Sequence, residues 1–435
     1  MSGGGLHRLS ASELVQGLAR RALRAEDVMR DCLDRTAERE PLVHAFTHLA
    51  TDAALAAARQ LDAGPVRGLL HGLPLGVKDL FDMHDMPSSY GSPIYAGHRG
   101  TSDAAAVALC RAAGALVVGK TVTTEFATYE PGPTRNPHAL DRTPGGSSSG
   151  SAAAVADCML PLAIGTQTAG SIIRPAAFCG VVGFKPSFAR VPRAGMKLLS
   201  ESLDTIGGFA RSVADVALLA SVLTGDDLLF ASAAAALKTD ATPAPRIGWF
   251  QGPQWPLVSA DTQRLWDRVT DRLAVLSPGA SEVAAPQGFD GLTALQSDLM
   301  AFEAARSLTH ERVQHADQLS AKLTALLGAG QRINGKAHGA MLAALQAWRQ
   351  RALELFERHD VLIAPSAVGE AGWLSDGTGD PVFCRAWTLL GLPCLHLPLG
   401  VGASGLPIGL QLIGRPNDDA HLLQVGGWLH PRLLG

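Results

Sequence analysis

The segment IGTQTAGSIIRPAAFCGVVGFKPS, residues 164–187, places a turn of small residues inside an apolar frame of strand and helix patterns. Within it, TQTAGS offers consecutive backbone N–H groups beside small side chains, so a carbonyl oxygen can approach them as in an oxyanion hole. Ser171 ends this turn. The segment therefore predicts a serine nucleophile in an α/β protein.

A second serine-rich stretch, GGSSSGSAAAVA, covers residues 145–156 and leads directly into an alanine-rich helical pattern. A flexible linker is the ordinary interpretation of a Gly/Ser run. This run, however, lies between apolar strand and helix patterns and is followed by a second Gly-Ser turn. A loop that carries chemistry is therefore favoured over a linker.

A serine hydroxyl needs a base, and no compelling pair of His and Asp accompanies these stretches. The segment GLPLGVKDLFD, residues 72–82, places Lys78 at the end of an apolar strand. Desolvation at that position can lower the pKa of the amine until it is neutral and accepts a proton. The alternative, which this segment alone would favour, is a surface lysine paired with Asp79 or Asp82.

Composition indicates a globular chain with a small-molecule substrate. Of 435 residues, 47% are hydrophobic and 18% are charged, and the net charge of -3 provides no basic surface for nucleic acid or an anionic membrane. No apolar run approaches the roughly 20 residues that span a bilayer. The first residues lack the apolar core of a signal peptide, and the cysteines form no CxxC pair. We expect a cytoplasmic protein.

Motifs that would bind a phosphate group or a metal are weak in this sequence. GALVVGKT, residues 114–121, matches the phosphate-binding loop pattern, but residues 115–118 are themselves an apolar strand, so a strand followed by a turn is the better interpretation. The histidines are scattered, without an HExxH motif or a Cys/His cluster. We therefore predict no metal and no other cofactor.

Organisation along the chain favours an α/β architecture, because short apolar runs alternate with helical stretches from His71 onward. Residues 1–63 have a helical pattern, and residues 224–351 hold long helical runs after one strand, RIGWF. The closing runs DVLIAP, CLHLPLGV and GLQLIG resemble strands that rejoin the first sheet. We expect a single domain over residues 1–435, with an N-terminal helical segment at 1–63 and a variable helical region at 224–351.

Three motifs in one order, GLPLGVKD, GGSSSGSAAA and GTQTAGSIIRPAAFCGVVGFKPS, resemble those of the amidase signature family of Ser-Ser-Lys hydrolases. The resemblance covers nearly the whole chain. It implies an α/β domain with a mixed, mostly parallel sheet of about eleven strands flanked by helices. It also implies that Lys78 is the base, that Ser147 relays the proton after a cis peptide bond, and that Ser171 attacks the carbonyl of a linear amide.

The resemblance further implies that the N–H groups of Thr168, Ala169, Gly170 and Ser171 form the oxyanion hole. This turn departs from many family members, in which an Asp and a Gly-Gly pair replace Gln167 and the pair Ala169–Gly170. The extra methyl group keeps every N–H group, so we expect activity to survive while the shape of the acyl site changes.

Arg174, three residues after the nucleophile, is similar to the arrangement in malonamidase-like members, where an arginine holds a substrate carboxylate. With Gln167 it is a candidate substrate-binding residue. The alternative for Arg174 is an internal ion pair that supports the loop. An acidic amide of small size is therefore one candidate substrate.

Several functions remain open after these assignments. The resemblance implies hydrolysis of a small carboxylic amide to an acid and an amine or ammonia. The same triad would also serve a carbamate, urea-type or aryl-amide hydrolase. A glutaminase subunit of an amidotransferase complex is less favoured, because in the transamidase arrangement the arginine of SIIRP falls one position earlier. The substrate and the oligomeric state stay open, a homodimer included.

Overall fold

One continuous mixed sheet runs through the computed structural model, which describes residues 5–236 and 244–434. Its strands within these residues are β1 (Phe46–Leu49), β2 (Pro74–Lys78), β3 (Leu116–Thr121), β4 (Leu162–Gln167), β5 (Val182–Lys185), β6 (Thr205–Ala210), β7 (Ile247–Trp249), β8 (Ser281–Glu282), β9 (Val361–Pro365), β10 (Cys394–Val401) and β11 (Pro407–Ile413). Their spatial order is β1-β3-β2-β4-β6-β5-β10-β11-β9-β7-β8. The single eleven-stranded domain predicted from the sequence is confirmed.

Parallel pairing is confined to two blocks of this sheet. Across the described strands, β2 pairs parallel with β3 and β4, and β7 pairs parallel with β8 and β9. The other six pairs are antiparallel. The closing runs form an antiparallel hairpin, β10 and β11, because a short turn can only join antiparallel strands. The sheet is therefore mixed, as predicted, but the parallel pairs are the smaller group.

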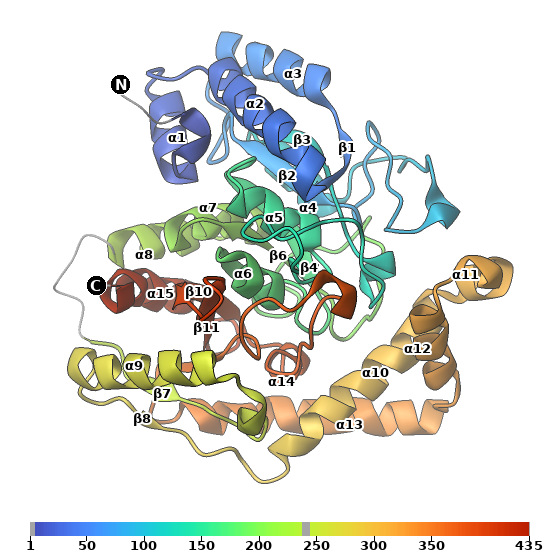
Figure 1. Cartoon of the computed structure of the whole chain (residues 1–435), viewed down its shortest axis with the longest axis vertical. Coiled ribbons are helices and arrows are strands. Elements are labelled where there is room, and N and C mark those ends of the chain that lie inside the picture. Colours follow the sequence, from blue (N-terminus) through green and yellow to red (C-terminus); the bar gives the residue numbers. More distant parts are fainter. Residues whose placement is uncertain (1–4, 237–243, 435) are drawn as a thin grey trace.

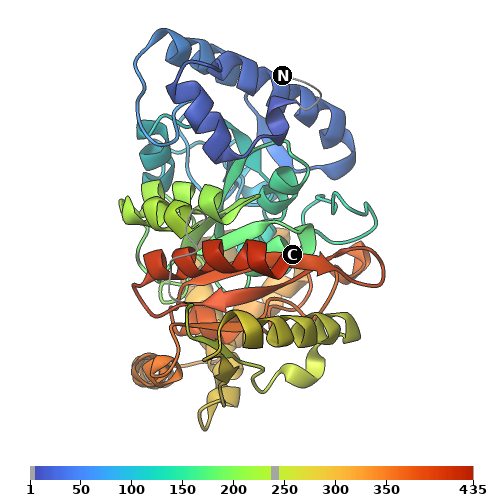
Figure 2. The ribbon, with the colours of Figure 1, turned by 90° about the vertical axis from the view of Figure 1, so that its left-hand side faces the viewer.

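Helices surround the sheet. Those in the described part of the chain are α1 (Ala11–Ala19), α2 (Ala25–Val43), α3 (Thr51–Ala63), α4 (Ala105–Ala112), α5 (Ser149–Ala156), α6 (Ile173–Cys179), α7 (Val213–Thr224), α8 (Leu228–Ala236), α9 (Ala260–Leu276), α10 (Leu292–Ser307), α11 (Thr309–Gln314), α12 (Ala321–Gln331), α13 (Gly335–Arg351), α14 (Arg385–Leu389) and α15 (Asp419–Leu434). Figures 1 and 2 show α1–α3 at one end of the long axis and α9, α10 and α13 at the other. None of these described helices is both long and apolar enough to cross a membrane.

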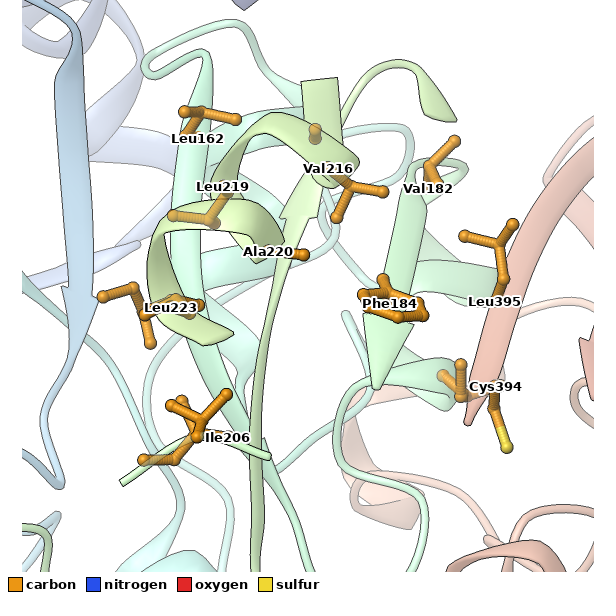
Figure 3. Packing of buried hydrophobic residues seen from close by; sticks show 14 of the residues in the cluster. Leu162, Val182, Phe184, Ile206, Val216, Leu219, Ala220, Leu223, Cys394 and Leu395 are labelled. Carbon is orange, nitrogen blue, oxygen red and sulfur yellow. The ribbon is translucent and has the colours of Figure 1, made fainter. Parts of the chain in front are cut away.

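Side chains alternate between the two faces of the central strands, as the two-residue period of a strand requires. Leu162 and Ile164 of β4 point toward α7, whereas Ala163 packs with α5 and α6. Figure 3 shows the α7 side, where Leu219 and Val216 lie over β4, β5 and β6. Both faces are thus buried, which explains why these strands are continuous apolar runs in the sequence.

The N-terminal segment differs from the expectation in one element. Residues 11–63 form α1, α2 and α3 as predicted, but Phe46–Leu49 between them is a strand, β1, that pairs antiparallel with β3 at the edge of the sheet. Only four residues long and partly exposed, it has too little alternation to be recognised in a helical context. Residues 1–4 of the predicted segment lie outside the described residues.

Candidate functional site

Lys78 is the last residue of β2, and its side chain is fully buried. Because β2 and β4 run parallel with Val77 opposite Ile164, the ends of both strands meet at one edge of the sheet. Lys78 Nζ lies 2.7 Å from Ser147 Oγ and 2.7 Å from Thr166 Oγ1. The structure therefore brings together the predicted base and the predicted relay serine.

The electrostatic setting of Lys78 favours a neutral amine. Burial lowers its pKa well below the usual value of 10.5, against the weaker opposing attraction of Asp204. Among residues 5–236 and 244–434, no carboxylate lies within 4.0 Å of Lys78 Nζ, since Asp79 instead pairs with Lys120 at 2.9 Å. The surface ion pair considered for Lys78 is absent from this part of the chain, and Lys120 of the discarded phosphate-loop match is a buried strand residue.

Ser147 lies in the loop that precedes α5, and the peptide bond between Gly146 and Ser147 is cis, as expected. The neighbouring serines make local contacts. Ser148 Oγ donates to the carbonyl of Thr166 at 3.2 Å, and Ser151 Oγ donates to the carbonyl of Ile164 at 2.9 Å. These bonds tie the loop to β4, so the position of Ser147 is fixed by the serines that follow it.

The turn after β4 contains the four residues that the sequence predicts as an oxyanion hole. In the described structure, no hydrogen bond leaves the N–H groups of residues 168–171, and the Ser171 hydroxyl has no hydrogen-bond partner. Thr168, Ala169 and Ser171 line a small cavity together with Arg174. Free N–H groups that border a cavity beside a serine are what stabilisation of a tetrahedral oxyanion requires.

Contacts from distant elements hold this turn at Thr168 and Ala169. Thr168 Oγ1 donates to Asp204 at 2.5 Å, and Gln296 Nε2 from α10 donates to the Thr168 carbonyl at 3.0 Å. Thr388 Oγ1 from α14 donates to the Ala169 carbonyl at 2.7 Å. None of these three partners was identified from the sequence. Asp204 lies in the run SLDTIGG, residues 202–208, directly before β6.

Gln167 is placed behind the turn, away from the cavity. Its Nε2 donates to Thr388 Oγ1 at 2.9 Å, and its Oε1 accepts from the N–H groups of Ile172 and Ile173. The side chain is completely buried and does not line the cavity at Ser171. The geometry thus gives Gln167 a supporting role at the start of α6.

Arg174 borders the same cavity as Ser171 and is only 5% exposed. Its Nη2 donates to the Gly146 carbonyl at 2.6 Å and to Thr378 Oγ1 at 3.2 Å. Burial lowers the pKa of Arg174 to about 10, and no carboxylate within the described residues lies within 4.0 Å of it. The internal ion pair considered as the alternative for Arg174 is therefore not formed by these residues.

The lowered pKa of Lys78 predicts how activity and stability depend on pH. If Lys78 is the base, as the sequence predicts, kcat/KM should fall as pH drops below its lowered pKa, because only the neutral amine accepts a proton. Between that pKa and 10.5 the unfolded chain binds one more proton than the folded chain, so this group makes stability rise with pH, by up to about 1.4 kcal/mol per unit. A pH–rate profile and unfolding at several pH values test both effects. Lys78→Met should remove this contribution to the pH slope, and an unchanged slope would contradict the assignment.

Metal ligands are sparse in the described residues. There, one group could offer three ligand atoms, His84, Asp85 and Asp103. Arg111 already occupies it, with Nη2 2.7 Å from Asp85 and Nε 3.2 Å from Asp103. The group is distinct from the residues that line the Ser171 cavity. The arrangement at Ser171 consists instead of hydroxyls, backbone N–H groups and two buried basic side chains.

Comparisons with known proteins agree with the overall fold. The family model described as Amidase matches residues 27–423. A glutamyl-tRNA(Gln) amidotransferase subunit from Acidothermus cellulolyticus is 35% identical over 476 aligned positions, which cover 98% of this chain and 94% of that protein. A solved amidase is 31% identical with a TM-score of 0.88, covering 98% of this chain and 100% of the other. The peptide amidase of Stenotrophomonas maltophilia is 29% identical with a TM-score of 0.84, covering 98% and 97%.

Proposed function

Because this chain belongs to the amidase family, we propose that it hydrolyses a small carboxylic amide to an acid and an amine or ammonia through an acyl-enzyme on Ser171. The observation that carries the proposal is the buried contact of 2.7 Å between Lys78 Nζ and Ser147 Oγ. A lysine without a carboxylate partner, next to a serine and near a turn of free N–H groups, supplies the base, the relay and the oxyanion hole of one acyl transfer.

The proposed mechanism moves one proton along a relay. Ser171 Oγ attacks the amide carbonyl while its proton passes to Ser147, and the Ser147 proton passes to neutral Lys78. The N–H groups of residues 168–171 receive the negative oxygen. The tetrahedral intermediate breaks its C–N bond as the proton returns through Ser147 to the leaving nitrogen. Water then attacks the ester by the same route and releases the acid with free Ser171.

A hydrolysis screen tests this function directly. The purified chain should be incubated with malonamate, aliphatic amides, anilides and carbamates, and the products identified by mass spectrometry. Hydrolysis of malonamate or an aliphatic amide supports the proposal. Turnover of carbamates or anilides alone would replace it with the alternative that uses the same triad.

Arg174 supports an acidic substrate, because a buried guanidinium beside Ser171 keeps donors that no carboxylate of the described residues occupies. Arg174→Lys should lower the ratio of kcat/KM on malonamate to that on acetamide at least tenfold, since lysine cannot form the bidentate pair. The ratio is the informative measurement, because Arg174 also contacts the Gly146 carbonyl and its loss affects both substrates. An unchanged ratio would remove carboxylate recognition from this residue.

An amidotransferase subunit is the second candidate, since the relative from Acidothermus cellulolyticus has that description. The 476 aligned positions exceed the 435 residues of this chain, so that relative contains segments with no counterpart here. Amide hydrolysis by the purified chain alone would favour the independent amidase. Glutamine hydrolysis that requires an added partner protein would favour the amidotransferase role.

A further inference from the structure

The cavity beside Ser171, here called the inner cavity, is too small for a whole substrate. Its volume is about 20 Å³, and a single buried water needs about 10–15 Å³ by the same measure. Tyr129 and Pro381 also form walls of a second cavity of about 660 Å³, here called the outer cavity. Sites for small ligands usually measure about 300–1,000 Å³. The larger half of a substrate that reacts at Ser171 therefore extends into the outer cavity.

Arg385, the first residue of α14, is a wall of the outer cavity and is only 9% exposed. Its Nη1 donates to Gln296 Oε1 at 2.5 Å, which is the one hydrogen bond of the Arg385 side chain within the described residues. No carboxylate of these residues lies within 4.0 Å of its guanidinium. The remaining N–H groups of Arg385 are not buried away from solvent, so an anion that enters the outer cavity can replace the water on them.

The other charges of the outer cavity are more exposed than Arg385. Lys322 of α12 is paired with Glu130 at 3.2 Å, and both side chains are about half exposed. Asp376 and Asp380 belong to the exposed loop before α14. Water screens these groups, whereas the positive field of Arg385 acts in a buried environment. The wall of the outer cavity that contains Arg385 therefore has the chemistry of an anion site.

We propose that the outer cavity binds a carboxylate carried by the leaving amine, so that the substrate is the amide of an amino acid whose carboxylate pairs with Arg385. The inference rests on the amidase function proposed above, with the carbonyl at Ser171 and the acyl group in the inner cavity. Gln296 links the two regions, since its Oε1 accepts from Arg385 and its Nε2 donates to the Thr168 carbonyl. A substrate carboxylate would thus be bound by Arg385, whose side chain holds Gln296, the residue that donates to the turn at Thr168.

Two matched substrates measure the preference for a leaving amine that carries a carboxylate. N-acetyl-4-aminobutyrate and N-(4-hydroxybutyl)acetamide have the same acyl group and the same chain length, but only the first has a carboxylate. The intact protein should hydrolyse the first with at least tenfold higher kcat/KM, mainly through a lower KM. Arg385→Gln should reduce the preference to about one, and Arg385→Lys should retain part of it because the charge remains.

Lys322→Gln is the matched control, since it removes a positive charge from the same cavity at a position already paired with Glu130. It should keep most of the preference. Equal loss in Lys322→Gln and Arg385→Gln, or an unchanged preference in Arg385→Gln, would overturn the inference. Because both substrates are measured on the same protein, an unstable variant lowers both rates and leaves their ratio unaffected.

The carboxylate site and the amidase function fail in different ways. Hydrolysis of both acetamides at equal rates by the wild type would overturn the carboxylate site alone. If no amide in the wider screen were hydrolysed in a Ser171-dependent way, the amidase function itself would be overturned.

Discussion

Ser171→Ala should leave a folded protein whose amide turnover is at least a thousandfold lower than that of the wild type. The proposed acyl-enzyme cannot form without the hydroxyl, and loss of a nucleophile typically costs several orders of magnitude in kcat. Stability should change by no more than about 0.5 kcal/mol, because the Ser171 hydroxyl has no hydrogen-bond partner in the described structure. Turnover on the best substrate of the screen and thermal unfolding measure the two effects.

Ser149→Ala provides the matched control for this experiment. Its hydroxyl lies in the same serine-rich loop but makes only a long contact of 3.5 Å with the Ser147 carbonyl. Activity in this variant should stay within tenfold of the wild type. Mass spectrometry of the intact protein during turnover should detect an acyl adduct in the wild type and none in Ser171→Ala. Near-normal turnover in Ser171→Ala would exclude the assigned nucleophile.

Lys78→Met should separate activity from stability. Methionine has a similar shape but no amine, so proton transfer through Ser147 is lost and turnover should fall at least about a thousandfold. The stability of the folded protein should change little, because removal of a buried amine that lacks a carboxylate partner among the described residues offsets the loss of its hydrogen bonds with Ser147 and Thr166. Kinetics and chemical unfolding of the same preparation test this pair of results.

Lys120→Met is the contrasting variant. Lys120 is equally buried, but it pairs with Asp79 at 2.9 Å, so its removal leaves a buried carboxylate without that partner. Breaking such a pair typically costs about 3–5 kcal/mol. Lys120→Met should therefore lose stability, whereas Lys78→Met should lose activity. A Lys78→Met protein that retains more than a tenth of wild-type turnover would require another base.

The candidate triad could be predicted because each member lies in a short motif whose local pattern is distinctive. Lys78 ends an apolar strand, Ser147 follows two glycines, and Ser171 closes a turn of small residues. Such patterns can be recognised in the sequence, because the turn and the strand end are each formed by residues that are neighbours along the chain. The assigned roles stay predictions until the variants are measured.

The supports of the site could not be predicted, because they are long-range contacts. Gln296, Thr388 and Arg385 come from α10 and α14, more than one hundred residues after the turn that they support. Nothing in a local pattern distinguishes them from ordinary helix residues. Strand direction has the same origin, since the pairing of β10 with β5 depends on tertiary contacts rather than on the apolar pattern of either strand.

The division of the cavity walls has a consequence for how this enzyme can diversify. The residues proposed for bond cleavage all lie between positions 78 and 171, whereas much of the outer cavity comes from α12 and from residues 376–385. Recombination or drift in those later segments can change which amides are accepted without touching the proton relay. Substitutions in α12 and in residues 376–385 can therefore change the substrate preference while Lys78, Ser147 and Ser171 are retained.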